Sequence, residues 1–134
     1  MACPLVRNRR RRLPTSQMSF QKIAEVKLKE LDQVIMVLRE PSSITRRTFD
    51  EACAKAGIQP KVLLELDSRE AVTEAVAAEL GVGVVSSVEV SHDPRVAAVP
   101  IIGEGLVNRH MMGCMERRRD LRLIQAFFGL APTS

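Results

Sequence analysis

The chain has 134 residues, enough for one domain, and its 46% hydrophobic and 27% charged content is typical of a globular rather than a disordered protein. The absence of Trp and Tyr, with only four Phe, argues against a platform that stacks the bases of single-stranded nucleic acid. The net charge of +4 comes from residues 1–30, with eight basic and two acidic side chains. Residues 31–134 carry twelve basic and fourteen acidic side chains.

Residues 1–19 combine two prolines and the arginines at 7 and 9–12 with little periodicity, which predicts a basic, poorly ordered leader. The arginine run is interpreted as a solvated charged segment. A phosphate-contacting arm is the alternative, because arginines bind polyanions without needing a fold. Neither a signal-peptide core nor an apolar run of membrane-spanning length follows, so we expect a cytoplasmic protein without membrane contact. Residues 20–32 predict a short amphipathic segment.

The residues that most often carry chemistry are sparse. Cys3, Cys53 and Cys114 are odd in number and far apart, which argues against a disulfide framework or a zinc site and fits a reducing compartment. His92 and His110 lack the spacing of a nucleophile motif or a metal site. We therefore expect no catalytic residues, no metal and no cofactor, and a protein that is not an enzyme.

An alternation of strands and helices begins at Val34. Residues 34–38 form a continuous apolar run that predicts a strand buried on both faces. Residues 45–56 carry apolar side chains at helical spacing and end at Gly57, and residues 61–66 predict a second strand.

A second helix follows after residue 66. Asp67 lies three residues before Glu70, which resembles a capping box. The stripe expected to be buried consists of Ala71, Val72, Ala75, Val76 and Leu80. Residues 82–85 then predict a third strand. The short connections favour two right-handed crossovers and hence an α/β fold with a parallel sheet.

The remaining elements are an extended segment at 96–102, a strand at 110–115 and a terminal amphipathic helix that begins at Glu116. The helix presents four apolar side chains, Leu121, Ile124, Phe127 and Phe128.

The turn from Pro41 to Arg46 is the best candidate for a binding site, because it follows a parallel strand and opens a helix, where free N–H groups favour an anion. Ser42, Ser43 and Thr45 supply hydroxyl groups, and Arg46 or Arg47 supplies charge. The alternative, that Ser42 or Ser43 only caps the helix, is equally open. Ser68, in the turn after the second strand, is expected at the same edge, although capping also explains it.

Residues 39–47, with the sequence REPSSITRR, and residues 64–85 together resemble the effector-binding region of LysR-type transcriptional regulators. The likeness extends over about residues 28–130. Within the family, the sequence is most similar to regulators associated with phosphonate catabolism. The resemblance implies a type 2 periplasmic-binding-protein fold, in which a small and often anionic effector binds between two α/β subdomains.

The resemblance also implies how the chain is divided and what it does. Residues 33–105 match the second subdomain, and residues 106–134 match the strand and C-terminal helix that return to the first. The family's hydroxyl-bearing turn matches Ser42, Ser43 and Thr45, whereas Ile44 departs from its more usual glycine. We therefore expect an effector-binding fragment that reversibly binds a small anionic metabolite to control transcription allosterically.

Two further expectations concern partners. The family's helix-turn-helix has no counterpart in the sequence, so DNA binding is expected to belong to a domain that is absent from this chain. The terminal helix lacks its sheet neighbours, so exposed apolar surface predicts a homo-oligomer. The alternatives are a solute-binding module of the same fold and a nucleic-acid binder that acts through the basic leader.

Overall fold

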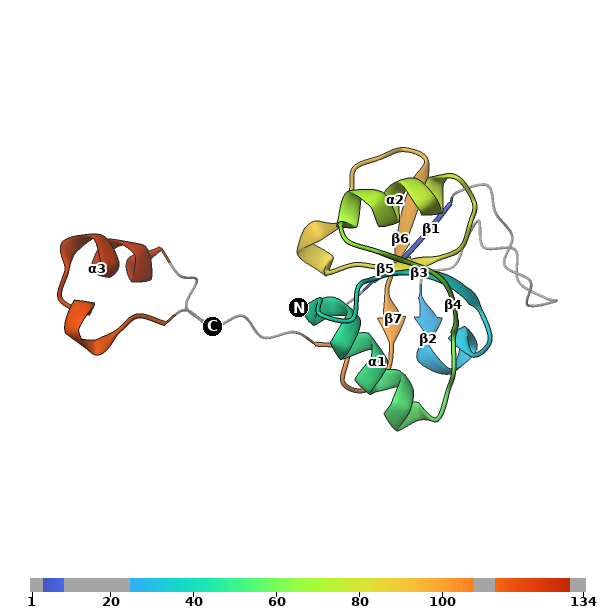
Figure 1. Cartoon of the computed structure of the whole chain (residues 1–134), viewed down its shortest axis with the longest axis horizontal. Helices are drawn as coiled ribbons and strands as arrows, with labels where there is room; N and C mark the ends of the chain where they lie inside the picture. The colour runs from blue at the N-terminus through green and yellow to red at the C-terminus, as the bar shows by residue number, and fades with distance from the viewer. Residues whose placement is uncertain (1–3, 9–24, 108–112, 131–134) are drawn as a thin grey trace.

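The computed structural model describes residues 4–8, 25–107 and 113–130 (Figure 1). The strands are β1 (Leu5–Asn8), β2 (Val26–Lys27), β3 (Ile35–Arg39), β4 (Lys61–Leu66), β5 (Gly83–Val84), β6 (Val96–Val99) and β7 (Ile101–Ile102). The helices are α1 (Ile44–Ala56), α2 (Arg69–Ala77) and α3 (Arg122–Gly129), with 3₁₀ turns at Leu28–Leu31, Ser87–Glu89 and Glu116–Arg118.

The predicted strand–helix alternation is confirmed from β3 to α2. β3 and β4 pair in parallel, with Ile35 opposite Lys61 and Arg39 opposite Leu66. On the other side of β3, Val37 N donates to the carbonyl of Val82 at 2.9 Å, within a parallel bridge between Met36 and Val82. The carboxyl ends of β3 and β4 therefore meet at one edge, from which α1 and α2 begin.

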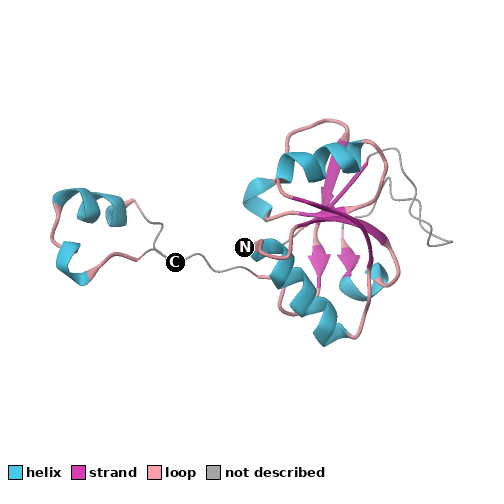
Figure 2. Ribbon diagram, in the orientation of Figure 1, coloured by secondary structure: helices cyan, strands magenta, loops and turns pink. Residues whose placement is uncertain are grey.

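Residues 36–38 of β3 are buried on both faces, as the apolar run predicts, because α1 and α2 lie on opposite sides of this strand (Figure 2). Ile35, at the start of β3, is 39% exposed, and β4 is exposed along most of its length. Met36 and Leu38 pack with Phe49 and other side chains of α1 in one core cluster. Val37 belongs to a second cluster, together with Val72, Ala75 and Val76 of α2. These two clusters fix the orientation of both helices and hence the position of the turns before them.

The N-terminal segment differs from the expected leader. Leu5–Asn8 form β1, which lies antiparallel between β5 and β6 in a three-stranded sheet. Leu5 lies opposite both Val84 and Val99, so β1 occupies strand edges that its distant neighbours leave open. The expectation of a poorly ordered leader is thus wrong for these four residues, whereas the arginines at 9–12 and residues 20–24 lie outside the described part.

Several predicted details need correction. Ser68 rather than Asp67 caps α2, because its Oγ accepts a hydrogen bond from the Ala71 N–H at 3.1 Å. Leu80 lies beyond the end of α2 and is 43% exposed. The third strand shortens to Gly83–Val84, the residues that pair with β1. The extended segment 96–102 divides into β6 and β7, and β7 pairs in parallel with β2.

The C-terminal part is less regular than predicted. Of the strand expected at 110–115, residues 110–112 lie outside the described ranges, and residues 113–115 form no strand. The helix starts at Arg122 rather than Glu116, after a 3₁₀ turn. No residue of α3 is buried, and Figure 1 shows α3 apart from the α/β body. Among the described helices, none has the length and apolar character needed to cross a membrane.

Candidate functional site

The turn between β3 and α1 leaves the start of the helix open. Ser43 occupies the N-cap position with extended backbone angles, yet its side chain makes no capping hydrogen bond. The first N–H groups of any α-helix lack partners within the helix, and no acidic side chain lies in the first turn of α1. Ser43 and Thr45 are half-buried and Ser42 is exposed. The geometry therefore provides N–H groups and hydroxyls at one helix end.

An ion pair lies beside this turn. The Arg39 guanidinium donates to both carboxylate oxygens of Glu40, at 2.9 and 3.0 Å. These bonds are the main reason that the pKa of Glu40 lies below its ordinary value, and Ser42 makes a smaller contribution through its own hydrogen bond. Glu40 is therefore ionised at neutral pH, and its charge is balanced by Arg39. The Ser42 hydroxyl is already engaged with Glu40.

Arg46 is held by the protein itself. Its side chain is only 9% exposed and its Nη1 donates to the carbonyl of Arg39 at 2.7 Å and to Glu65 Oε1 at 3.1 Å. Its Nε donates to the Asp50 carboxylate at 2.8 and 3.0 Å. These bonds tie α1 to β4 and to the end of β3, so Arg46 positions the turn. Arg47 is exposed and forms no ion pair within the described residues, which leaves its charge free.

Ser68 lies in the neighbouring turn, as predicted. The Glu40 N–H donates to the carbonyl of Leu66 at 3.0 Å, which joins the turns after β3 and β4. Ser68 is half-buried at the N-cap of α2, where its Oγ already accepts one hydrogen bond. The structure therefore brings the predicted hydroxyl residues to one edge of the β3–β4 pair, where the Ser68 hydroxyl also caps α2.

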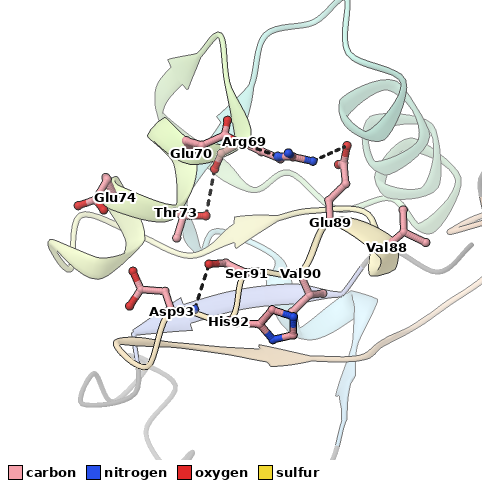
Figure 3. Close-up of a pocket in the computed structure, with 10 residues that line it drawn as sticks. All are labelled: Arg69, Glu70, Thr73, Glu74, Val88, Glu89, Val90, Ser91, His92 and Asp93. Carbon is pink, nitrogen blue, oxygen red and sulfur yellow. Dashed lines mark hydrogen bonds and ion pairs between the residues drawn. The ribbon is translucent and has the colours of Figure 1, made fainter.

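A cavity of about 420 Å³ lies between α2 and residues 88–93 (Figure 3). Arg69 extends from α2 and contacts Glu89 across the cavity at 3.7 Å, and it also pairs with Glu70 at 2.6 Å. Neither Ser42, Ser43, Thr45 nor Arg46 lines this cavity. Sequence reasoning missed the residues that do line this cavity, because the segment 88–93 carries no motif and its contact with α2 depends on the fold.

Further carboxylates of this cavity are also paired. Arg95 donates to Glu74 at 2.6 Å and to Asp93 at 2.6 Å. Hydrogen bonds from the Arg95 side chain, followed by its backbone N–H, hold the pKa of Asp93 below its ordinary value. The cavity is thus lined mainly by ion pairs that already satisfy each other, so it offers less open binding chemistry than the start of α1.

The described residues offer little for catalysis or metal binding. Within residues 4–8, 25–107 and 113–130, no three His, Cys, Asp or Glu side chains gather as potential metal ligands. Burial, with a smaller contribution from Asp50, raises the pKa of the Cys53 thiol to about 11, so this cysteine is a poor nucleophile at neutral pH.

Comparison with known proteins adds a family and a fold. The model of the family described as the LysR substrate binding domain matches residues 4–133. No curated protein matches the chain. The regulatory domain of Synechocystis PCC6803 CcmR, solved with 2-PG, superimposes with a TM-score of 0.65 at 18% identity, over 96% of this chain and 60% of that chain.

Two further structures show the same fold. The effector-binding domain of QuiR, solved with shikimate, gives a TM-score of 0.63 at 16% identity, over 75% of this chain and 45% of that chain. Full-length CbnR, solved with its target DNA, gives a TM-score of 0.61 at 22% identity, over 78% of this chain and 35% of that chain. The chain thus spans at most 60% of these proteins, and the likeness confirms the predicted α/β fold of the type 2 periplasmic-binding-protein class.

Proposed function

Because the chain belongs to the LysR substrate-binding domain family, we propose that it is the part of a transcriptional regulator that reversibly binds a small anionic metabolite, without turning it over. The observation that carries the proposal is the open start of α1, where the Ser43 side chain makes no capping bond. CcmR and QuiR were each solved with a small organic molecule bound, which supports a metabolite as the ligand class.

The chemistry at this helix start favours an anion with several oxygen atoms. N–H groups of the first turn of α1 and the hydroxyls of Ser43 and Thr45 can donate to such oxygens, and the helix dipole adds a partial positive charge. Arg47 supplies a free positive charge on the same turn of α1, while Arg46 holds the turn in place. A phosphonate, the ligand class suggested by the sequence resemblance, satisfies these requirements. Ser42 and Ser68 lie at the same edge of the β3–β4 pair and add two neighbouring hydroxyl groups.

The family also suggests how binding is used. In a regulator with two subdomains, an effector in the cleft changes their relative position, and this change is coupled to a DNA-binding domain that lies outside this chain. Such a regulator acts in the cytoplasm, where the DNA is. The chain spans only part of its structural neighbours, so it carries only part of the cleft and we expect its own affinity to be weak.

The first test is a titration of the ¹⁵N-labelled chain with methylphosphonate, inorganic phosphate and sulfate, followed by NMR. We expect saturable shifts of the Ser43, Ile44 and Thr45 amides with a dissociation constant of about 1 mM, because few contacts hold the anion. The Ser43→Ala/Thr45→Val variant should weaken binding about 30-fold, since each of the two lost hydrogen bonds contributes roughly 1 kcal/mol.

Gln59→Ala is the control for this variant, because Gln59 is an exposed polar residue that lies just before β4, at the opposite end of the β3–β4 pair from both turns. It should bind like the unmodified chain. Submicromolar affinity in the isolated chain would contradict a partial cleft, and unchanged affinity in Ser43→Ala/Thr45→Val would remove the proposed site.

We also propose that the chain associates with a second copy of itself. Apolar side chains on α3 and on the edge strand β4 are exposed, including Phe127, at 57%, and Leu63, at 54%. Residues 25–107 contain fourteen acidic and nine basic side chains, whereas residues 113–130 contain two acidic and four basic side chains. These two parts of the described chain therefore carry net charges of opposite sign, which favours contact between the C-terminal part of one copy and residues 25–107 of another.

A further inference from the structure

A second cavity lies at the other end of α1. It has a volume of about 480 Å³ and lies between the C-terminal half of α1, the 3₁₀ turn after β2, and the residues after β7. Because α1 contains thirteen residues at about 1.5 Å each, its two ends are about 20 Å apart. One small ligand cannot contact both this cavity and the Ser43 turn.

The floor of this cavity is apolar. Ala52 and Ala56 lie one helical turn apart on α1, and the cavity is also lined by Leu28, from the 3₁₀ turn after β2, and Ile102, from β7. The two alanines leave a hollow that larger side chains would fill. Gly103 also lines the cavity, and a side chain there would meet the Leu28 Cβ at 2.8 Å, so the backbone approaches closely at this point.

The rim of the cavity is basic. Lys27, Lys29 and Lys55 line it with a single carboxylate, that of Glu104. None of the three ammonium groups forms an ion pair in the described part of the chain. By contrast, Arg39, Arg46, Arg69 and Arg95 are all paired with carboxylates. Positive charge is thus uncompensated at this cavity.

We propose that this lysine-rimmed cavity is a second ligand site, which binds a small amphipathic anion with an apolar body and one carboxylate, phosphate or phosphonate group. The apolar floor takes the hydrocarbon part, because its burial removes apolar surface from water. The lysines hold the anionic group at the rim, where it replaces the missing carboxylate partners. The volume lies within the range of small-molecule pockets.

Phenylphosphonate is a suitable probe, because it joins a ring to an anionic group. Titration of the ¹⁵N-labelled chain should give saturable shifts of the Lys29, Ala52, Lys55 and Gly103 amides. Inorganic phosphate, which lacks the apolar body, and benzyl alcohol, which lacks the charge, should each shift these amides only at about tenfold higher concentration.

The Lys29→Gln/Lys55→Gln variant removes two of the three charges from exposed positions and should weaken binding of phenylphosphonate about tenfold. Lys61→Gln is the matched control, because Lys61 is an exposed lysine on β4 that does not line the cavity. It should bind like the unmodified chain. Ala56→Leu fills the hollow and should also weaken binding, although it leaves every charge in place.

The same spectra separate this proposal from the anion site at the start of α1. Shifts confined to Ser43, Ile44 and Thr45, no saturable shift at the cavity, or equal affinity in Lys29→Gln/Lys55→Gln and the unmodified chain would each overturn the second site. Shifts at the cavity without any at the Ser43 turn would support the second site and count against the first.

Discussion

The Phe127→Asp/Phe128→Asp variant is expected to remain monomeric at concentrations at which the unmodified chain forms dimers. Both rings are exposed on α3 and pack edge to face, with centroids 6.4 Å apart. Together they offer an apolar surface that self-association would bury. Burial of a Phe side chain contributes roughly 1.5–3 kcal/mol, so loss of two should raise the dimer dissociation constant by on the order of 100-fold or more.

Sedimentation equilibrium across a range of protein concentrations measures this effect. Val88→Asp is the control, because Val88 is an exposed apolar residue, at 66%, outside α3 and β4. It should dimerise like the unmodified chain. An unmodified chain that stays monomeric at every concentration, or a double variant that dimerises as well as the control, would refute association through α3.

A Leu63→Lys variant separates the contribution of β4 from that of α3. β4 pairs with β3 on one side only, and exposed apolar edge strands readily pair with another chain. If α3 carries the interface alone, Leu63→Lys leaves the dimer dissociation constant unchanged. If the partner's α3 covers β4, this variant weakens the dimer as well.

The Gly83→Val variant is expected to lose about 3 kcal/mol of the free energy of unfolding. A Cβ atom at position 83 would lie 2.7 Å from the Val72 Cγ1 and 3.3 Å from the carbonyl oxygen of Val37. Both neighbours are fully buried, and the second contact involves backbone that cannot rotate away. Overpacking in a core typically costs 1–3 kcal/mol, and a branched side chain belongs at the upper end, about 3 kcal/mol.

Urea unfolding followed by circular dichroism measures this loss. Gly113→Val is the control, because no atom lies within 4 Å of a Cβ built at Gly113. It should change the free energy of unfolding by less than about 0.5 kcal/mol. In a chain that already carries Val72→Ala, Gly83→Val should cost less, because the nearest clashing methyl group is gone. Equal costs in both backgrounds would show that Val72 is not the obstacle.

Sequence patterns predicted the elements whose signals are local. The apolar run of β3 and the helical spacing around Phe49 reflect burial by α1 and α2, and both clusters are found where the pattern places them. β1 was missed because its only signal is the open edges of β5 and β6, which lie more than seventy residues further along the chain. The sequence left the N-cap of α2 open between Asp67 and Ser68, because both are good capping types, and the structure places Ser68 there.

The candidate site was predictable in position but not in detail. Topology alone places Ser42, Ser43 and Ser68 at one edge, because parallel strands end together. The partners of Arg46 could not be predicted, since Glu65 lies on another element and its approach depends on the packing of α1 against β4. The same holds for the lysine-rimmed cavity, whose lysines come from segments that are distant in sequence.

The placement of β1 has a consequence for how the protein folds. Leu5 pairs with Val99, a separation of more than ninety residues, so β1 leaves the ribosome long before its partner strand β6. Contacts of such long range slow folding. During synthesis, β1 can pair with β5 as soon as β5 emerges, whereas its other edge stays unpaired until β6 is available.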